Sequence, residues 1–415
     1  MRKLATAILM MAAAAPVSAQ GGYGSAVAAA GDVLYVAEPL NVARAGTVYA
    51  YARGEDGMWR EAGTLRAPAS RPGDLFARSI AAAGDVVIVG YPAEAEGAGA
   101  AHAFQRQNGT WLHTGRLVDP AGSAGDSAGA AVAVHGDVAA VAAPGRFAVQ
   151  VFRRNGVEWH QEATFTVDSV GAADRFGAAL AVGADRIVVG APGTADGRGG
   201  AYVFEREDGA WLRRAHITAD SAQAGSALGS SVALVEDAIA LGAPGHDRQS
   251  GGVFVFRFDP VSDGWVESAR LEASDGGRGT RLGASLAVTA DGLWAGAPGR
   301  RAAYRFTRDS TTGEWTAAGR VVNPSNRAHT QFAAALAATD SVLIIGIPDI
   351  VGTGTALAAE RRADGSWAPA TALRSDPEEF PAHTGGVQPC TDGRAASFDC
   401  SGVELLGYLP ISALG

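Results

Sequence analysis

Histidine is the residue type in this chain best suited to acid–base catalysis or to binding a transition metal. The eight histidines are scattered without the short spacings that metal motifs require, at His102, His113, His135, His160, His216, His246, His329 and His383. No H-E-x-x-H, C-x-x-C, glycine-rich phosphate loop or G-x-S-x-G pattern occurs. We therefore expect surface or structural roles for the histidines, and we predict no catalytic residues, no cofactor and no metal site.

Aspartate recurs in two series that could bind cations. The first lies on a short turn in each part of the chain, at Asp32, Asp85, Asp137, Asp185, Asp237, Asp291 and Asp340. The second lies in longer polar segments, at Asp119, Asp126, Asp168, Asp174, Asp220 and Asp275. Calcium takes six to eight oxygen ligands, which one carboxylate on a short turn cannot supply. We expect tight-turn stabilisation from the first series and solvated caps or turns from the second, with weak cation binding at a pair such as Asp168 and Asp174 as the alternative.

Charged side chains in polar loops between apolar segments are the candidates for contacts with a partner. Arg198, His246, Asp247 and Arg248 lie in two such loops. Loops on a rigid scaffold commonly carry binding residues. We predict that these four residues belong to a binding face for an unidentified protein or glycan.

These residues are positioned by a unit of about fifty residues that occurs seven times between Tyr23 and Arg374. Each unit opens on an apolar residue followed by Gly or Ala, at positions 23–24, 76–77, 128–129, 176–177, 228–229, 282–283 and 332–333. A proline follows in each, at Pro39, Pro92, Pro144, Pro192, Pro244, Pro298 and Pro348. A tryptophan comes next, at Trp59, Trp111, Trp159, Trp211, Trp265, Trp315 and Trp367. The series advance together by 48 to 54 residues, so the unit is a structural one.

One unit reads as four antiparallel strands. Residues 176–182 and 186–191 are apolar runs bounded by turns, residues 200–206 alternate aromatic and smaller side chains, and a more polar strand begins at Trp211. Such a blade cannot cover its own faces, whereas seven arranged radially bury each face against the next. The pattern predicts an all-β, seven-bladed β-propeller of four-stranded antiparallel blades, with solenoids as the rival architecture. We expect the tryptophans to pack between blades, with a ligand-facing aromatic belt as the alternative.

Phe176-Gly177 followed by Gly190-Ala191-Pro192, with Gly242-Ala243-Pro244 and Gly296-Ala297-Pro298 later, resembles the FG-GAP repeat of integrin alpha-subunit propellers and of many exported bacterial proteins. The resemblance implies a seven-bladed β-propeller used as a rigid extracellular surface for binding macromolecules. Many members also bind calcium in a loop between the first two strands of a blade. Here that loop is a turn such as Gly136-Asp137 or Ala184-Asp185, so calcium binding is not carried over.

Ring closure is expected to rest on face packing between units one and seven. Propellers of this kind usually take the outermost strand of the last blade from a segment ahead of the first unit, and only residues 20–22 lie between the expected leader and Tyr23. We predict that blade seven uses its own residues 367–374 as the fourth strand. Its third-strand segment, residues 354–359, lacks aromatic residues, which suggests the weakest joint in the ring.

Export is indicated by residues 1–19, which combine Arg2 and Lys3, an apolar stretch and a small-residue cleavage site as in a signal peptide. Removing these residues changes the formal charge from −9 to −11, with 32 basic against 43 acidic residues. An acidic chain is poorly suited to nucleic-acid binding. We predict a propeller over residues 20–375, monomeric, without a transmembrane segment, in the periplasm, at the cell surface or secreted.

The tail, residues 376–415, begins with an acidic, proline-containing linker and contains the two cysteines. In an oxidising compartment we expect a disulfide between Cys390 and Cys400. The segment from Cys390 to Leu406 has a faint resemblance to the start of a choice-of-anchor B domain. Two hypotheses stay open, namely that the tail begins a further domain and that it docks onto the propeller.

The sequence thus favours an exported, non-enzymatic scaffold that presents propeller loops to a protein or glycan. The alternative is a propeller that forms or accompanies a hydrolase acting on polysaccharide or lipid head groups. A purely architectural spacer is the third possibility.

Overall fold

The structure is a computed structural model and describes residues 22–40, 45–71, 74–324, 331–348, 354–368, 370–373, 394–395 and 398–399. The expected leader and disulfide, together with His329 and His383, lie outside these residues. The chain divides into two compact units, Met1–Leu373 and Arg374–Gly415. Within the second, the described residues form the short hairpin β29 (Arg394–Ala395) and β30 (Phe398–Asp399).

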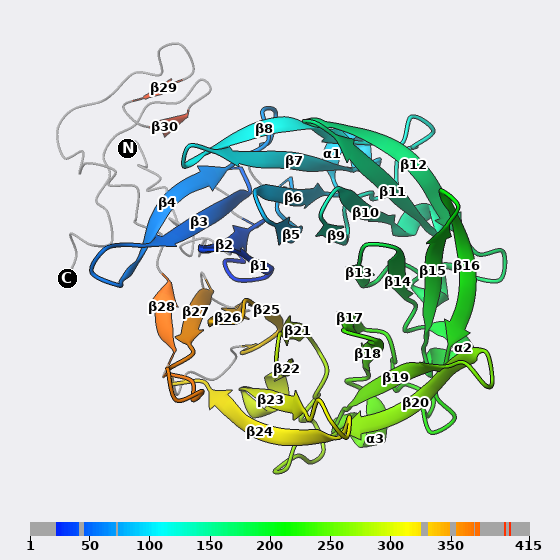
Figure 1. Cartoon of the computed structure of the whole chain (residues 1–415). Coiled ribbons are helices and arrows are strands. Elements are labelled where there is room, and N and C mark those ends of the chain that lie inside the picture. The colour runs from blue at the N-terminus through cyan, green and yellow to red at the C-terminus, as the bar shows by residue number, and fades with distance from the viewer. Residues whose placement is uncertain are drawn as a thin grey trace, which may run out of the picture. The chain divides into compact units, whose positions relative to one another are not determined.

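The first unit is a seven-bladed β-propeller of four-stranded antiparallel sheets, each with its strands in chain order (Figure 1). The first strands, which lie innermost, are β1 (Val27–Ala30), β5 (Ser79–Ala83), β9 (Val132–His135), β13 (Leu180–Val182), β17 (Ser231–Val235), β21 (Leu286–Thr289) and β25 (Ala335–Ala338). The second strands are β2 (Val33–Glu38), β6 (Val86–Tyr91), β10 (Val138–Ala143), β14 (Arg186–Gly190), β18 (Ala238–Gly242), β22 (Gly292–Ala297) and β26 (Val342–Ile347).

The third strands are β3 (Thr47–Arg53), β7 (Ala100–Gln107), β11 (Ala148–Asn155), β15 (Ala201–Glu207), β19 (Val253–Asp259), β23 (Ala302–Arg308) and β27 (Thr355–Glu360). The outermost strands are β4 (Trp59–Leu65), β8 (Thr110–Leu117), β12 (Glu158–Thr166), β16 (Ala210–Ile217), β20 (Gly264–Leu271), β24 (Trp315–Val322) and β28 (Thr371–Leu373). Short helical turns lie between strands at α1 (Glu94–Gly97), η1 (Pro144–Arg146), η2 (Ala172–Asp174), α2 (Thr194–Gly197), α3 (His246–Gln249) and η3 (Pro298–Arg300). No helix among the described residues is long and apolar enough to cross a membrane.

The strand order gives the ring two faces. The turns between first and second strands and between third and fourth strands lie at one end of each blade, which we call the hairpin face. The loops between second and third strands and the connections between blades lie at the other end, which we call the loop face. Arg198, which follows α2, and the predicted binding residues in α3 therefore share the loop face.

Seven apolar clusters hold the ring together, and each one joins two consecutive blades. Each cluster includes the half-buried tryptophan of its second blade packed against the first; Trp211, for example, packs on the cluster shared by blades 3 and 4. Some indole nitrogens also reach across the joint, as Trp59 Nε1 does to Glu360 at 2.9 Å. These contacts confirm the prediction that the tryptophans anchor adjacent blades. Burying a large aromatic ring at a joint stabilises the packed faces.

The opening motif of each unit is a turn and not the start of a strand, so the strand predicted over residues 176–182 is wrong in its first half. β13 begins only at Leu180, and Gly177 has a left-handed φ of 85°. The motif instead contacts the preceding blade. A Cβ added at Gly190 would lie 2.1 Å from the carbonyl oxygen of Gly229 in the next blade. The same close approach occurs at Gly90, Gly242, Gly296 and Gly346. It explains why small residues occur both in the opening motif of one blade and near the end of the second strand of the blade before it.

Closure of the ring follows the expected route. Blade 7 is complete in itself, with β28 as its fourth strand. Tyr23 pairs with Gly354 in an isolated parallel bridge, and its hydroxyl lies 2.5 Å from that of Tyr51. An apolar cluster joins blades 7 and 1, so face packing closes the ring.

Candidate functional site

Three of the four predicted binding residues line one open groove on the loop face. Arg198, His246 and Asp247 meet there, whereas Arg248 does not line it. The groove has a volume of about 710 Å³ and lies between blades 4 and 5. We call it the blade 4–5 groove, lined by Arg198, Asp220, Ser221, Ala222, Gln223, Ala224, His246, Asp247, Arg270 and Glu272.

The loops that present these residues have an unusual backbone. In α3, Asp247 and Arg248 both have left-handed φ/ψ values, and Ala195 and Asp196 do the same in α2. Consecutive left-handed residues other than glycine are costly, of the order of 1–2 kcal/mol each, and persist only where the surroundings fix them. Arg198 and His246 are therefore held by loops of defined shape.

The sequence of these two polar loops does not predict the other residues that line the groove. Residues 220–224 belong to the connection between blades, Arg270 lies in the last part of β20, and Glu272 directly follows that strand. The strand order is the signal that could have predicted these residues. In each blade, the end of the fourth strand and the connection to the next blade lie at the same end as the loop after the second strand. For Asp220, the sequence predicts only a solvated cap or turn.

His246 is a buried side chain that lines the groove. It is 7% exposed, and its Nδ1 lies 3.2 Å from the hydroxyl of Ser226, which accepts the Gln223 amide at 2.8 Å. The roles in the Ser226–His246 contact depend on the tautomer: where the hydroxyl donates to Nδ1, the proton of the neutral ring lies on Nε2. Burial, followed by the nearby Arg270, lowers the pKa of His246 and favours this neutral form. Nε2 has no partner among the described residues.

The two guanidinium groups of the groove differ in how they are held. Arg270 lies over the ring of Phe254, 4.7 Å from its centroid, and donates to Glu267 at 2.9 Å. Arg198 is exposed and has no hydrogen-bond or ion-pair partner within the part of the chain that the structure describes. The groove thus combines one fixed cation, one free cation and the exposed carboxylates of Asp220, Asp247 and Glu272.

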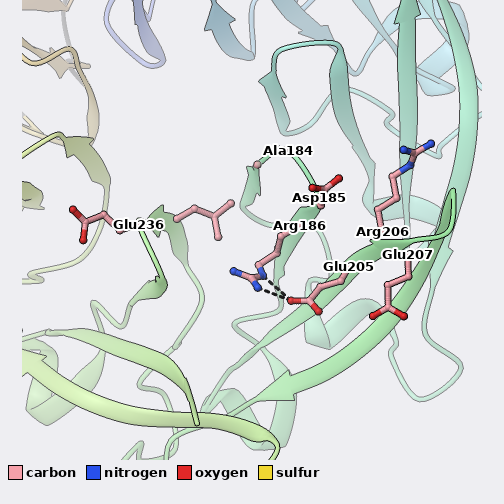
Figure 2. Close-up of a pocket in the computed structure, with 9 residues that line it drawn as sticks. Ala184, Asp185, Arg186, Glu205, Arg206, Glu207 and Glu236 are labelled. Carbon is pink, nitrogen blue, oxygen red and sulfur yellow. Dashed lines mark hydrogen bonds and ion pairs between the residues drawn. The ribbon is translucent and has the colours of Figure 1, made fainter. Parts of the chain in front are cut away.

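A second pocket, of about 460 Å³, lies between the same blades on the hairpin face (Figure 2). Four of its charged residues already pair with protein groups: Arg186 with Glu205 at 2.7 Å, Arg206 with Glu162 at 2.8 Å, and Glu236 with Arg308 at 2.8 Å. These ion pairs link consecutive blades or strands. The pocket is therefore better explained as part of a structural network than as a binding site.

This joint also has an exchanged arginine. The third-strand residue opposite the tryptophan is Arg106 in blade 2, where its guanidinium lies 5.2 Å from the centroid of Trp111, but Phe258 in blade 5. The guanidinium that lies over Trp265 comes instead from Arg186 of blade 4, at 4.8 Å from the ring centroid. Trp265 of blade 5 therefore has a cation–π contact whose guanidinium comes from the preceding blade, blade 4.

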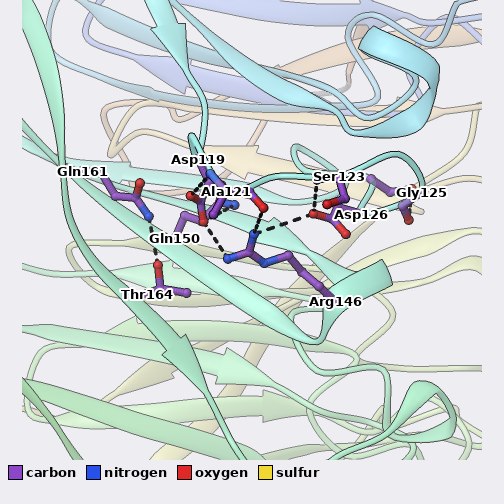
Figure 3. Close-up of polar contacts among 10 residues, drawn as sticks. Asp119, Ala121, Ser123, Gly125, Asp126, Arg146, Gln150, Gln161 and Thr164 are labelled. Atoms are coloured by element: carbon purple, nitrogen blue, oxygen red, sulfur yellow. Dashed lines mark hydrogen bonds and ion pairs between the residues drawn. The ribbon is translucent and has the colours of Figure 1, made fainter.

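The acidic pair before blade 3 is not solvated as expected. Asp119 and Asp126 are 8% and 9% exposed, and Arg146 of η1 lies 2.6 Å from Asp119 and 3.7 Å from Asp126 (Figure 3). Both carboxylates also cap backbone amides, at Ala121 and Ser123. The capping role is confirmed, whereas the solvated environment was wrong because a guanidinium from another loop covers the pair. Among the described residues, no group of three or more His, Cys, Asp or Glu side chains is placed to hold a metal ion.

Two histidines that are well separated in the sequence meet in blade 2. His102, 3% exposed, lies with Nδ1 2.9 Å from His113 Nε2 and with Nε2 2.8 Å from Glu94, which Arg116 also contacts at 2.9 Å. Burial, with the adjacent His102, lowers the pKa of His113. Burial alone would raise the pKa of Glu94, but His102 and Arg116 hold it below its usual range.

This cluster predicts acid sensitivity. A histidine whose folded pKa is lowered binds protons more readily when unfolded, so its contribution to stability is complete above about pH 6.5 and declines as the pH falls below that value. Glu94 loses its contribution only further down, below about pH 4.5. We expect the thermal midpoint of unfolding to decrease when the pH is lowered from 8 to 5.5, and we expect this decrease to be smaller in His113→Asn. The exposed His135 provides the control. An equal decrease in His113→Asn and His135→Asn would contradict the assignment.

Comparison with known proteins agrees with this architecture. A family model for the FG-GAP repeat matches residues 159–204 and 211–256, so the chain contains FG-GAP repeats. No curated protein sequence matches the chain.

Similar solved structures share the fold at low sequence identity. One from Bacteroides fragilis, provisionally named a 6-phosphogluconolactonase, has 13% identity and a TM-score of 0.50, with 70% of this chain and 82% of that chain covered. A protein from Bacteroides uniformis with the same provisional name has 14% identity and a TM-score of 0.51, with 72% and 85% covered. A protein from Lactobacillus plantarum has 14% identity and a TM-score of 0.56, with 78% and 91% covered. At such identities these structures show the propeller fold alone.

Proposed function

We propose that this FG-GAP-repeat propeller is an exported, non-enzymatic binding scaffold, and that its partner, a protein or a glycan, contacts the blade 4–5 groove. FG-GAP repeats are typical of extracellular proteins, which supports the export predicted from residues 1–19. The observation that carries the binding site is a groove large enough for a ligand, lined by the guanidinium of Arg198, which has no partner among the described residues, and by the buried imidazole of His246.

The ring supports this role because it holds the groove in one shape. The second strands of blades 4 and 5 are almost entirely buried, and one apolar cluster joins the two blades across the floor of the joint. A preformed site loses little conformational entropy when it binds. The groove therefore offers oriented donors and acceptors without a prior rearrangement.

The test is a comparison of capture by matched variants. The full chain would be immobilised and incubated with cell-envelope and surface fractions, and bound material would be quantified for wild type, Arg198→Ala and Arg300→Ala. Arg300 is an exposed loop-face arginine in η3 of blade 6, outside the groove. We expect saturable capture by wild type and Arg300→Ala and at least tenfold less by Arg198→Ala.

Two results would contradict the proposal. Capture that is equal in all three proteins would place the partner elsewhere on the molecule. Release of products from a panel of polysaccharides or lipid head groups by the purified chain would contradict the non-enzymatic part.

A further inference from the structure

We infer that the blade 4–5 groove binds a carboxylate-bearing sugar, namely a uronic-acid residue of an acidic glycan. This inference rests on the proposed function and names the class of ligand for the same site. It follows from the number, charge and pairing state of the polar groups that line the groove.

The free cation selects an anionic group. Arg198 has no partner among the described residues, and a guanidinium binds a carboxylate through two parallel hydrogen bonds. Arg270 is already held by Glu267 and by the face of Phe254, so it contributes a fixed positive field and not a second free donor. One anionic group at Arg198 therefore pairs with the cation that has no partner among the described residues.

The acceptors limit how much negative charge the ligand can carry. The carboxylates of Asp220, Asp247 and Glu272 line the same groove, and they repel a ligand with several closely spaced anionic groups. The same carboxylates accept hydrogen bonds from hydroxyl groups. In the tautomer whose Nδ1 accepts from Ser226, His246 also donates from Nε2, which has no partner among the described residues.

A uronic acid matches this set. It carries one carboxylate for Arg198 and several hydroxyls, each of which can donate to a carboxylate and accept from His246. A protein partner fits less well, because protein interfaces depend on aromatic and other apolar anchors in desolvated pockets. Phe254 is fully buried beneath Arg270, and among the described residues that line the groove the aromatic ring is that of His246.

The experiment compares ligands that differ in one functional group, a carboxylate or its methyl ester. Trisaccharides of galacturonate, glucuronate and mannuronate, together with their uncharged methyl esters, would be titrated into the full chain by isothermal calorimetry at low ionic strength. We expect at least one uronate to bind, with at least tenfold weaker binding of its methyl ester. Arg198→Ala should weaken uronate binding at least tenfold, whereas Arg300→Ala should leave it unchanged. Because Arg198 is exposed, its replacement should not alter the thermal midpoint, which is measured alongside.

The remaining outcomes overturn the inference and separate it from the proposed function. If a methyl ester binds as well as its acid, the ligand is a neutral glycan and the groove remains the site. If no sugar of the panel binds while capture from surface fractions still depends on Arg198, the uronate class is wrong and the scaffold function remains. If neither binding nor Arg198-dependent capture is observed, both proposals fail.

Discussion

Gly190→Ala is expected to lower the free energy of unfolding by about 3 kcal/mol, at the upper end of the usual cost of overpacking. The added Cβ would lie 2.1 Å from the carbonyl oxygen of Gly229 and 3.3 Å from Val232. The obstructing atom belongs to the backbone of the neighbouring blade, so it cannot rotate away as a flexible side chain could. Relief requires blades 4 and 5 to move apart and thins the apolar cluster between them.

Chemical denaturation of matched variants measures this effect. Gly115→Ala is the control, because a Cβ at Gly115 in β8 meets nothing within 4 Å. We expect that control to lie within about 0.5 kcal/mol of wild type. Equal unfolding midpoints for Gly190→Ala and Gly115→Ala would show that the blades do not approach as closely as the structure indicates.

Arg146→Ala is expected to cost about 3 kcal/mol at pH 7, because it leaves two buried carboxylates without their shared cation. Arg300→Ala is a close control, since Pro144–Arg146 and Pro298–Arg300 are the same three residues in the same type of turn, and Arg300 is exposed. We expect a change of at most about 0.5 kcal/mol for Arg300→Ala.

The pH dependence separates this mechanism from a general packing defect. Burial alone would raise the pKa of Asp119, but the Ala121 amide and the Arg146 guanidinium hold it below its usual range. A lowered pKa contributes stability above the unfolded value of about 3.9, and that stability is lost as the pH falls through the folded value. In Arg146→Ala the part of this contribution that Arg146 supplies is absent, so the deficit relative to wild type should keep its pH 7 value down to about pH 4 and shrink as the pH falls below that value. A deficit that stays constant with pH would contradict the ion-pair explanation.

The fold could be predicted from the sequence because its main determinants are local and repeated. The tryptophan of each unit, such as Trp211, recurs at one position relative to the apolar runs, and its burial between blades follows from repeat packing. The opening turns were harder to assign. Phe176 and Gly177 extend an apolar run, and only the left-handed conformation at Gly177 and the contact with another blade separate them from β13.

The candidate site could be predicted only in part, because its remaining groups come together through tertiary structure. Arg198 and His246 lie in polar loops and were recognised there. Ser226 is almost fully buried and fixes the ring of His246 from a connection twenty residues earlier in the chain. Likewise, Asp119 is buried because Arg146, 27 residues later, covers it. Neither relationship leaves a pattern in a single sequence.

The exchanged arginine between blades 4 and 5 constrains how this ring could have changed its number of repeats. Deleting blade 5 would place Arg186 of blade 4 at the joint with Arg308, which is opposite Trp315, and would remove Glu236 and Asp237, the carboxylates that Arg308 pairs with. Two guanidinium groups would then meet at that joint without those carboxylates. Duplicating blade 4 in tandem would place Arg186 beside a second copy of Arg206 in the same way. Repeats that look interchangeable by length and motif are therefore not interchangeable in charge, and any gain or loss of a unit here would require a compensating substitution at one of these two positions.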